Sequence, residues 1–180
     1  VKDKTLKELK QMSINGEKIP TLADVIKTVK GKCELNIHIK DHHAVNEILR
    51  IIKKYNFEKK VLLSSFSKNT LKAVKKLNPK IRTAYIYSTP NLSYIELAKK
   101  LGLYALHPHF NLLTKRMVKR AHQNGIKVNV WTIRNRKMVM ALKKYDIDGI
   151  ITDDPLLYSR KKGSTLLERL SIFLEELLRW

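Results

Sequence analysis

Short apolar runs alternate with amphipathic stretches along most of the chain. Six runs are rich in β-branched or aliphatic residues and have the length of buried strands. The predicted strands are Cys33–Ile39, Val61–Ser65, Ile81–Tyr87, Tyr104–Leu106, Val128–Thr132 and Gly149–Thr152. Apolar residues at three- and four-residue spacing predict helices over Ala44–Tyr55, Lys68–Leu77, Leu92–Leu101, Thr114–Asn124 and Lys137–Tyr145. Strands that alternate with helices in this way predict an α/β fold of parallel βα units with helices covering the sheet.

The two ends of the chain lie outside this alternation. Thr5–Met12 and Thr21–Lys30 read as helices separated by a turn over Gly16–Pro20. After the last predicted strand, Thr165–Glu168 has a capping-box pattern that opens a helix over Leu166–Trp180 with a broad apolar face. We expect this helix to dock on the core of the chain; a membrane-surface or subunit contact is the alternative. The predicted division is residues 1–160 and a C-terminal amphipathic helix at 161–180.

The chain is strongly basic, with 37 Lys and Arg against 16 Asp and Glu and a formal net charge of +21. This charge predicts attraction to phosphates, acidic lipid surfaces or nucleic acid. Lysine pairs such as Lys53-Lys54 and Lys143-Lys144 recur on the predicted helices, which favours a solvated basic surface over one dedicated face. The tyrosines fall mostly in strands or helix seams, so no specific nucleic-acid site is expected.

Other compositional features indicate the compartment. Cys33 is the only cysteine, which excludes an internal disulfide and is compatible with a reducing compartment. No apolar run approaches the ~20 residues that span a bilayer, and the first residues lack a signal-peptide pattern. From these features a cytoplasmic protein is expected.

Polar residues stand at the ends of several predicted strands. Because side chains alternate along a strand, His38 and Lys40 point to the same side of the first one. His107 and His109 form a His-Pro-His turn after the fourth, a spacing that suits zinc weakly without further ligands. Trp131 ends the fifth strand, where core packing is the alternative to a binding role.

Six segments, taken together and in order, resemble a known family. They are Gly16–Leu22, Leu35–Lys40, Leu63–Phe66, Ala105–Pro108, Val128–Thr132 and Asp148–Pro155. Their sequences include Asn36-Ile37-His38-Ile39-Lys40 and Asp153-Asp154-Pro155. In order and spacing they resemble the glycerophosphodiester phosphodiesterase family.

The resemblance implies a TIM barrel, a fold of ~250 residues with eight strands and the active site at the C-terminal strand ends. Six of the eight βα units would be present here. The family's His-Arg-Gly strand, its Glu-x-Asp metal-binding strand and the following His-Asp are not found upstream of Thr5. The implied activity is the hydrolysis of glycerophosphodiesters to glycerol 3-phosphate and an alcohol. This chain alone is expected to be catalytically incomplete.

The resemblance also implies roles for individual residues. Lys40 matches a family lysine near the substrate phosphate and is the predicted catalytic residue. His38 replaces a family glutamate that binds a divalent metal, Mg²⁺ or Ca²⁺. Because these hard cations prefer oxygen ligands, the metal is expected to bind this chain poorly, and a structural histidine is the alternative. The predicted substrate-binding residues are Trp131, His107, Asn129 and Ser65.

Two further expectations concern partners. A glycerophosphodiester-type small molecule is the implied ligand, and the alternative function is a non-catalytic protein that binds a phosphate ligand or an anionic polymer. Unpaired edges at the first and last predicted strands are expected to recruit a second copy of the chain or a missing N-terminal segment.

Overall fold

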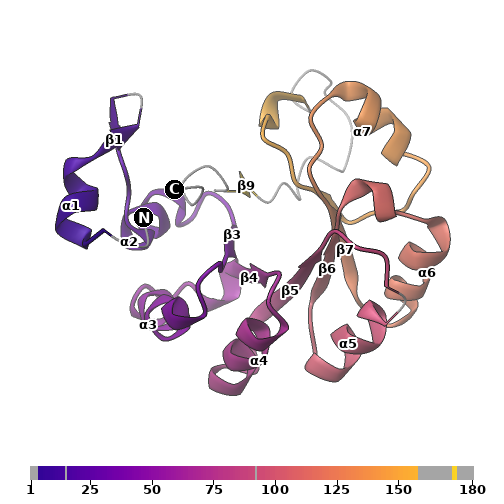
Figure 1. Cartoon of the computed structure of the whole chain (residues 1–180), viewed down its shortest axis with the longest axis horizontal. Helices are drawn as coiled ribbons and strands as arrows, with labels where there is room; N and C mark the ends of the chain where they lie inside the picture. The colour runs from indigo at the N-terminus through magenta and orange to yellow at the C-terminus, as the bar shows by residue number, and fades with distance from the viewer. Residues whose placement is uncertain (1–3, 15, 92, 158–171, 174–180) are drawn as a thin grey trace.

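The computed structural model describes residues 4–14, 16–91, 93–157 and 172–173 of the chain (Figure 1). Six parallel strands form a sheet that curls into half a barrel, as predicted. They are β3 (Leu35–His38), β4 (Val61–Ser65), β5 (Arg82–Tyr87), β6 (Ala105–Pro108), β7 (Lys127–Val130) and β8 (Gly149–Ile150). Each strand pairs with its sequence neighbour, which is the arrangement that consecutive βα units produce.

Five helices follow these strands on the outside of the curl (Figure 1). They are α3 (Val45–Lys54), α4 (Lys68–Leu77), α5 (Tyr94–Leu101), α6 (Lys115–Gln123) and α7 (Arg136–Leu142). Side-chain caps fix where three of them begin: the side chains of Ser67, Thr114 and Asn135 each accept a backbone N–H of the first turn. Short 3-10 turns are η1 (His42–Ala44), η2 (Glu58–Lys60), η3 (Phe110–Leu112) and η4 (Pro155–Leu157).

The segment before β3 contains two helices and a small hairpin. Helices α1 (Leu6–Gln11) and α2 (Leu22–Val29) were both predicted, and each begins with a capping box, on Thr5 and Thr21. Between them, β1 (Ser13–Ile14) pairs antiparallel with β2 (Glu17–Lys18). Gly16 has a φ of +85°, so it supplies the left-handed residue that this tight reversal requires. No helix of the described residues is long and apolar enough to cross a bilayer.

A seventh strand, β9 (Ile172–Phe173), pairs in parallel with β3, with Leu35 opposite Ile172. The predicted C-terminal helix Leu166–Trp180 otherwise lies outside the described residues, and at these two positions the helix prediction is wrong. The expectation of an unpaired edge at the first predicted strand is also wrong, because β9 occupies that edge. Ile and Phe suit a strand, and the open N–H and C=O groups of β3 provide the partner.

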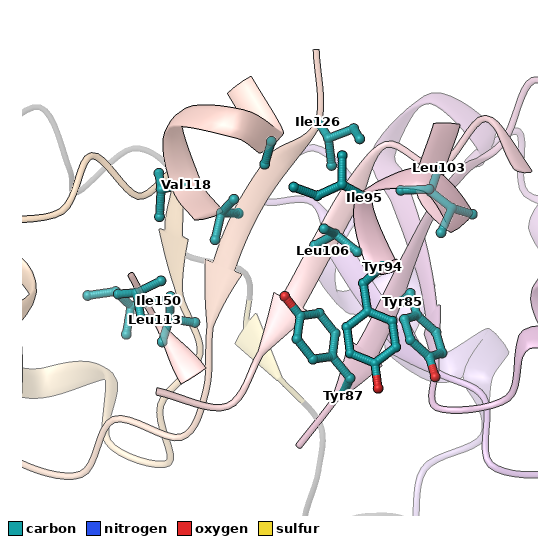
Figure 2. Packing of buried hydrophobic residues seen from close by; sticks show 14 of the residues in the cluster. Tyr85, Tyr87, Tyr94, Ile95, Leu103, Leu106, Leu113, Val118, Ile126 and Ile150 are labelled. Atoms are coloured by element: carbon teal, nitrogen blue, oxygen red, sulfur yellow. The ribbon is translucent and has the colours of Figure 1, made fainter. Parts of the chain in front are cut away.

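The two faces of the sheet differ in composition. On the outer face, Leu106, Val128 and Ile150 join the core beneath the helices, and Tyr85, Tyr87 and Tyr94 pack together at one end of it (Figure 2). The rings of Tyr87 and Tyr94 lie 4.2 Å apart between centroids. On the inner face, Leu62, Ala84 and Ala105 form a smaller cluster. The alternation along each strand therefore separates an apolar face under the helices from a face that also carries polar residues.

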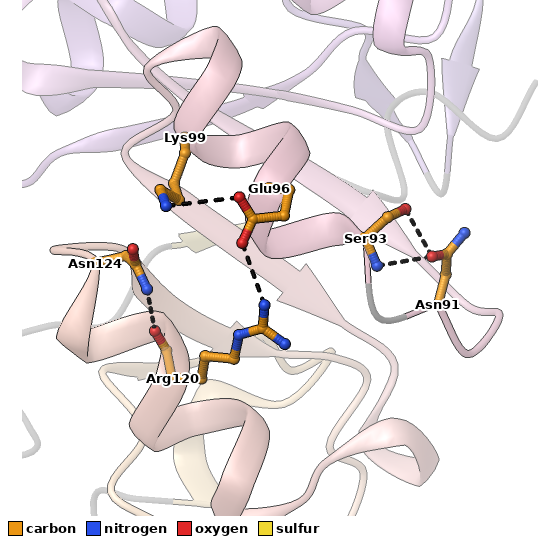
Figure 3. A network of polar contacts seen from close by, with 6 residues as sticks. All are labelled: Asn91, Ser93, Glu96, Lys99, Arg120 and Asn124. Carbon is orange, nitrogen blue, oxygen red and sulfur yellow. Dashed lines mark hydrogen bonds and ion pairs between the residues drawn. The ribbon is translucent and has the colours of Figure 1, made fainter.

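A carboxylate links two neighbouring helices. Glu96 of α5 pairs with Lys99 at 3.5 Å and with Arg120 of α6 at 3.2 Å (Figure 3). All three side chains are well exposed, so the pairs contribute little stability. Their effect is limited to positioning the side chains of Lys99 and Arg120.

Asp148, just before β8, joins the starts of two strands. Its carboxylate contacts Lys127 at 2.8 Å and His122 at 2.7 Å. It also accepts the Val128 N–H at 2.9 Å. Burial raises the pKa of Asp148, but the hydrogen bonds from these three groups together outweigh burial and lower it.

Replacing Asp148 with Asn is therefore expected to cost about 1–3 kcal/mol at neutral pH, which is about 2–4 °C in Tm for each kcal/mol. Because the folded pKa is lowered, this stability is present above the unfolded pKa near 4 and is lost as the pH falls through the folded value. Thermal unfolding of both proteins between about pH 3 and pH 7 measures the difference. A difference that does not shrink at the acid end would contradict the assigned ionic role.

Candidate functional site

The C-terminal ends of the parallel strands collect the polar residues singled out in the sequence. His38 ends β3 and lies opposite Ser64 of β4. His109 and Trp131 follow β6 and β7 and face each other across an isolated bridge. Lys40 and Asp153 lie just beyond the C-terminal ends of β3 and β8. The topology therefore brings residues from four strand ends to one end of the half-barrel, and Lys40 and Trp131 lie at the end expected for them.

Four rings form a continuous row across this end, which we call the aromatic row: His38, Phe66, Trp131 and His109. The centroid of Phe66 lies 5.6 Å from those of both His38 and Trp131. The Trp131 centroid lies 5.0 Å from that of His109. Phe66 and His109 both meet Trp131 nearly edge to face, an arrangement that aromatic rings prefer. The row crosses the sheet from β3 to β7.

Trp131 is held in place from below by the sheet. Its indole N–H donates to the backbone carbonyl of His107 at 2.8 Å, and its side chain is half-buried. Phe66 is 45% exposed, which is more than any other ring of the row. Its side chain can therefore offer a contact surface. Phe66 and Trp131 together form an apolar wall, and the hydrogen bond of the Trp131 indole N–H holds that ring in place.

Beneath the row lies a buried pair of polar side chains. His107 is fully buried, and its Nε2 lies 3.0 Å from the Asn129 amide nitrogen. Gly149 makes room for this pair, because a Cβ on Gly149 would come within 2.5 Å of Asn129 Oδ1. His107 Nδ1 has no hydrogen-bond partner within the described part of the chain. His107 and Asn129 thus lie together, and the substrate-binding role predicted for each of them stays a prediction.

The two buried histidines are uncharged at neutral pH. Burial, assisted by the positive charge of Lys40, lowers the pKa of His38 to about 4. Burial, assisted by His38, lowers the pKa of His107 to about 3. Neither imidazole therefore supplies a positive charge for a phosphate. The exposed Lys40 ammonium, close enough to influence His38, can supply it.

The serine and aspartate residues at this end have structural contacts. Ser65 Oγ donates to Ile39 O at 2.8 Å and accepts the Ser67 N–H at 3.1 Å, which ties β4 to the end of β3. The substrate-binding role predicted for Ser65 stays a prediction. Asp153 is exposed and pairs with Arg134 at 3.3 Å, consistent with a loop-shaping residue.

A divalent metal of the kind that the family resemblance implies does not fit the residues described. Among residues 4–14, 16–91, 93–157 and 172–173, no three His, Cys, Asp or Glu side chains come together as metal ligands. His38, which stands where the resemblance implies a metal-binding glutamate, is buried and neutral. Mg²⁺ and Ca²⁺ take oxygen ligands instead. No chemical step is therefore assigned to a metal here.

Phe66 is the site residue that sequence reasoning did not single out. It belongs to the Leu63–Phe66 segment, but no role was predicted for its apolar side chain. The available signal was its position immediately after the last residue of a predicted strand, where an apolar side chain emerges at the end of the barrel. Only the structure shows that Phe66 joins His38 to Trp131.

Comparisons with known proteins agree with this arrangement. The sequence model of the glycerophosphoryl diester phosphodiesterase family matches residues 1–157. A glycerophosphodiester phosphodiesterase from Caldanaerobacter subterraneus subsp. tengcongensis is 34% identical over 169 residues, covering 86% of this chain and 70% of that protein.

Solved structures are similar in fold. A phosphodiesterase from Oleispira antarctica, in complex with the product sn-glycerol-3-phosphate, matches with a TM-score of 0.79 at 24% identity, covering 86% of this chain and 69% of that one. A glycerophosphodiester phosphodiesterase from Parabacteroides distasonis matches with a TM-score of 0.73 at 26% identity, covering 87% and 71%. The half-barrel is therefore the same fold as a large part of these proteins.

Proposed function

This chain belongs to the glycerophosphoryl diester phosphodiesterase family, and from that membership we propose that its aromatic row and Lys40 bind the glycerol phosphate part of a glycerophosphodiester. The function that the family supports is glycerophosphodiester phosphodiesterase-like. The ligand class is supported by the Oleispira protein, which holds sn-glycerol-3-phosphate. The site lies at the C-terminal strand ends, where barrels of this kind carry their ligands.

The single observation that carries the proposal is the pairing of an apolar wall with one charged group. Phe66 and Trp131 offer ring surfaces on which glycerol carbons can pack. Lys40 places an ammonium near the neutral His38, so a phosphate at this end meets a positive charge. Glycerol phosphate has two complementary parts: carbon atoms that can pack on the rings and a phosphate dianion that can pair with the ammonium.

Replacing Lys40 with Ala is expected to weaken the binding of sn-glycerol-3-phosphate about ten-fold or more, because a charge-assisted hydrogen bond contributes about 1.5–3 kcal/mol. Isothermal titration calorimetry in the presence of a chelator measures this difference. Lys119→Ala, which removes an exposed lysine from α6, serves as the matched control and should bind as the unchanged chain does. Equal affinities in the Lys40→Ala and Lys119→Ala variants would overturn the proposed role of Lys40.

A further inference from the structure

The end of the half-barrel opposite the aromatic row carries an unusual share of the positive charge. In each βα unit the helix ends beside the start of the next strand, so the helix ends and following loops gather at one end of the sheet. We call this end the basal rim. It consists of residues 30–34, 53–60, 75–82, 99–104, 120–127 and 143–148.

Contacts between segments show that the basal rim is continuous. Glu34, before β3, pairs with Lys60 before β4 and with Arg82 at the start of β5. The Arg82 guanidinium lies over the ring of Tyr104 at 5.3 Å. Tyr104 in turn accepts the backbone N–H of Lys127 at 3.0 Å. The rim is therefore one surface made by neighbouring strand starts.

The charge of the two ends differs sharply. The basal rim holds 16 Lys and Arg against 4 Asp and Glu. The loops at the aromatic-row end hold 5 Lys and Arg against 3 Asp, counted over residues 39–44, 66–68, 88–91, 109–115, 131–136 and 151–157. Charge that served to attract a small anionic substrate would be concentrated at the row. The distribution therefore points to a second anionic partner at the rim.

Helix stability does not account for this distribution. A cation in the last turn complements the helix dipole, which explains one basic residue at each helix end. The rim has pairs at the ends of α3, α4 and α5, and Lys59 and Lys80 lie outside those helices. Within the described part of the chain, the exposed Lys76, Lys80 and Lys100 form no ion pair. These ammonium groups are available to an external anion.

We infer that the basal rim is a docking surface for an anionic phospholipid bilayer. Two exposed side chains favour lipid over nucleic acid: Leu77, at 55% exposure, follows Lys75 and Lys76, and Tyr104 is 38% exposed beneath Arg82. Leu among lysines suits insertion at the headgroup level, whereas single-stranded nucleic acid is bound by aromatic rings that are open for stacking. The Tyr104 ring is already occupied by Arg82.

Docking through the basal rim would set the orientation of the half-barrel on the bilayer. The aromatic row lies at the opposite end of the strands and would face the aqueous phase. Its ligand would then be a water-soluble glycerophosphodiester that arrives from solution rather than an intact lipid held in the bilayer. Vesicle binding itself needs no substrate, so it is independent of the proposed function of the row.

Sedimentation with vesicles of equal parts phosphatidylglycerol and phosphatidylcholine tests the inference on the full 180-residue chain. The variant K76E/K80E/K100E is expected to bind at least about 100-fold more weakly, since each lysine near an anionic surface contributes about five-fold and each glutamate adds repulsion. The single variant Lys76→Glu should show a loss of at least about five-fold. Vesicles of phosphatidylcholine alone should bind none of the proteins.

The matched control reverses three exposed charges away from the basal rim. K115E/R116E/R136E changes the net charge by the same amount and should lose less than about five-fold in vesicle binding. Equal losses in the two triple variants would overturn the inference, because net charge alone would then explain binding. Tight binding of a short DNA duplex by a chain that leaves the vesicles unbound would also overturn it, in favour of nucleic acid.

Discussion

The 180-residue chain, assayed with glycerophosphocholine or bis(p-nitrophenyl) phosphate and Mg²⁺, Ca²⁺ or Mn²⁺, is expected to hydrolyse neither substrate faster than buffer. General acid–base help is most effective when the pKa of the catalytic group lies near the working pH. Burial holds the pKa of His38 at about 4 and that of His107 at about 3, so neither carries a proton to donate at neutral pH. Each missing role costs about 10²–10⁴-fold.

We expect the same result for a variant in which His38 is replaced by a carboxylate. His38→Glu places the family's carboxylate at the end of β3, but one carboxylate does not make a site, and the described residues supply no group of three ligands around it. The variant is therefore expected to stay at the buffer rate. An active full-length relative provides the positive control. Metal-dependent hydrolysis by the unchanged chain that Lys40→Ala abolishes would contradict this account.

Mild acid is expected to destabilise the chain before most of its carboxylates titrate. His107 is fully buried and has a folded pKa of about 3, against about 6.5 when unfolded. The stability that depends on its neutral form is fully present above pH 6.5 and is lost as the pH falls toward the folded value, because only the unfolded chain then binds the proton. Between pH 6.5 and 4.5 this loss is about 2 kcal/mol.

Urea unfolding across that pH range measures the effect. His38 adds to it in the same direction, because burial also lowers its pKa. His107→Gln is expected to flatten the dependence of the free energy of unfolding on pH, even where it lowers that free energy at pH 7. His43→Gln, at an exposed position in η1, should leave the slope unchanged. The same slope in the unchanged chain and in His107→Gln would contradict the buried, neutral assignment.

Much of the fold follows from local patterns in the sequence. The strand Val61–Ser65 and the helix Lys68–Leu77 occur with the predicted bounds, because a buried apolar run and a Ser67 cap mark them locally. Other helices and strands begin or end at different residues than predicted, because a side-chain cap or a strand pairing sets their limits. Asn135 caps the helix that begins at Arg136 rather than Lys137. The fourth predicted strand extends to Pro108, whose carbonyl accepts the Trp131 N–H.

The parts that could not be predicted depend on long-range register. Nothing near Ile172 in the sequence indicates that it would lie beside Leu35. Alternation placed His38 correctly on the inner face, but the pairing of His107 with Asn129 depends on strand register and on the absence of a Cβ at Gly149. The position of Phe66 between His38 and Trp131 likewise arises only when β3, β4 and β7 curl together.

A crystal structure of this chain soaked with sn-glycerol-3-phosphate in the presence of a chelator tests the central claim most directly. The account predicts the phosphate within hydrogen-bonding distance of the Lys40 ammonium and the glycerol carbons against Phe66 and Trp131, with no metal between them. A ligand bound at the opposite end of the strands, or at this end without contact to Lys40 and the aromatic row, would contradict it.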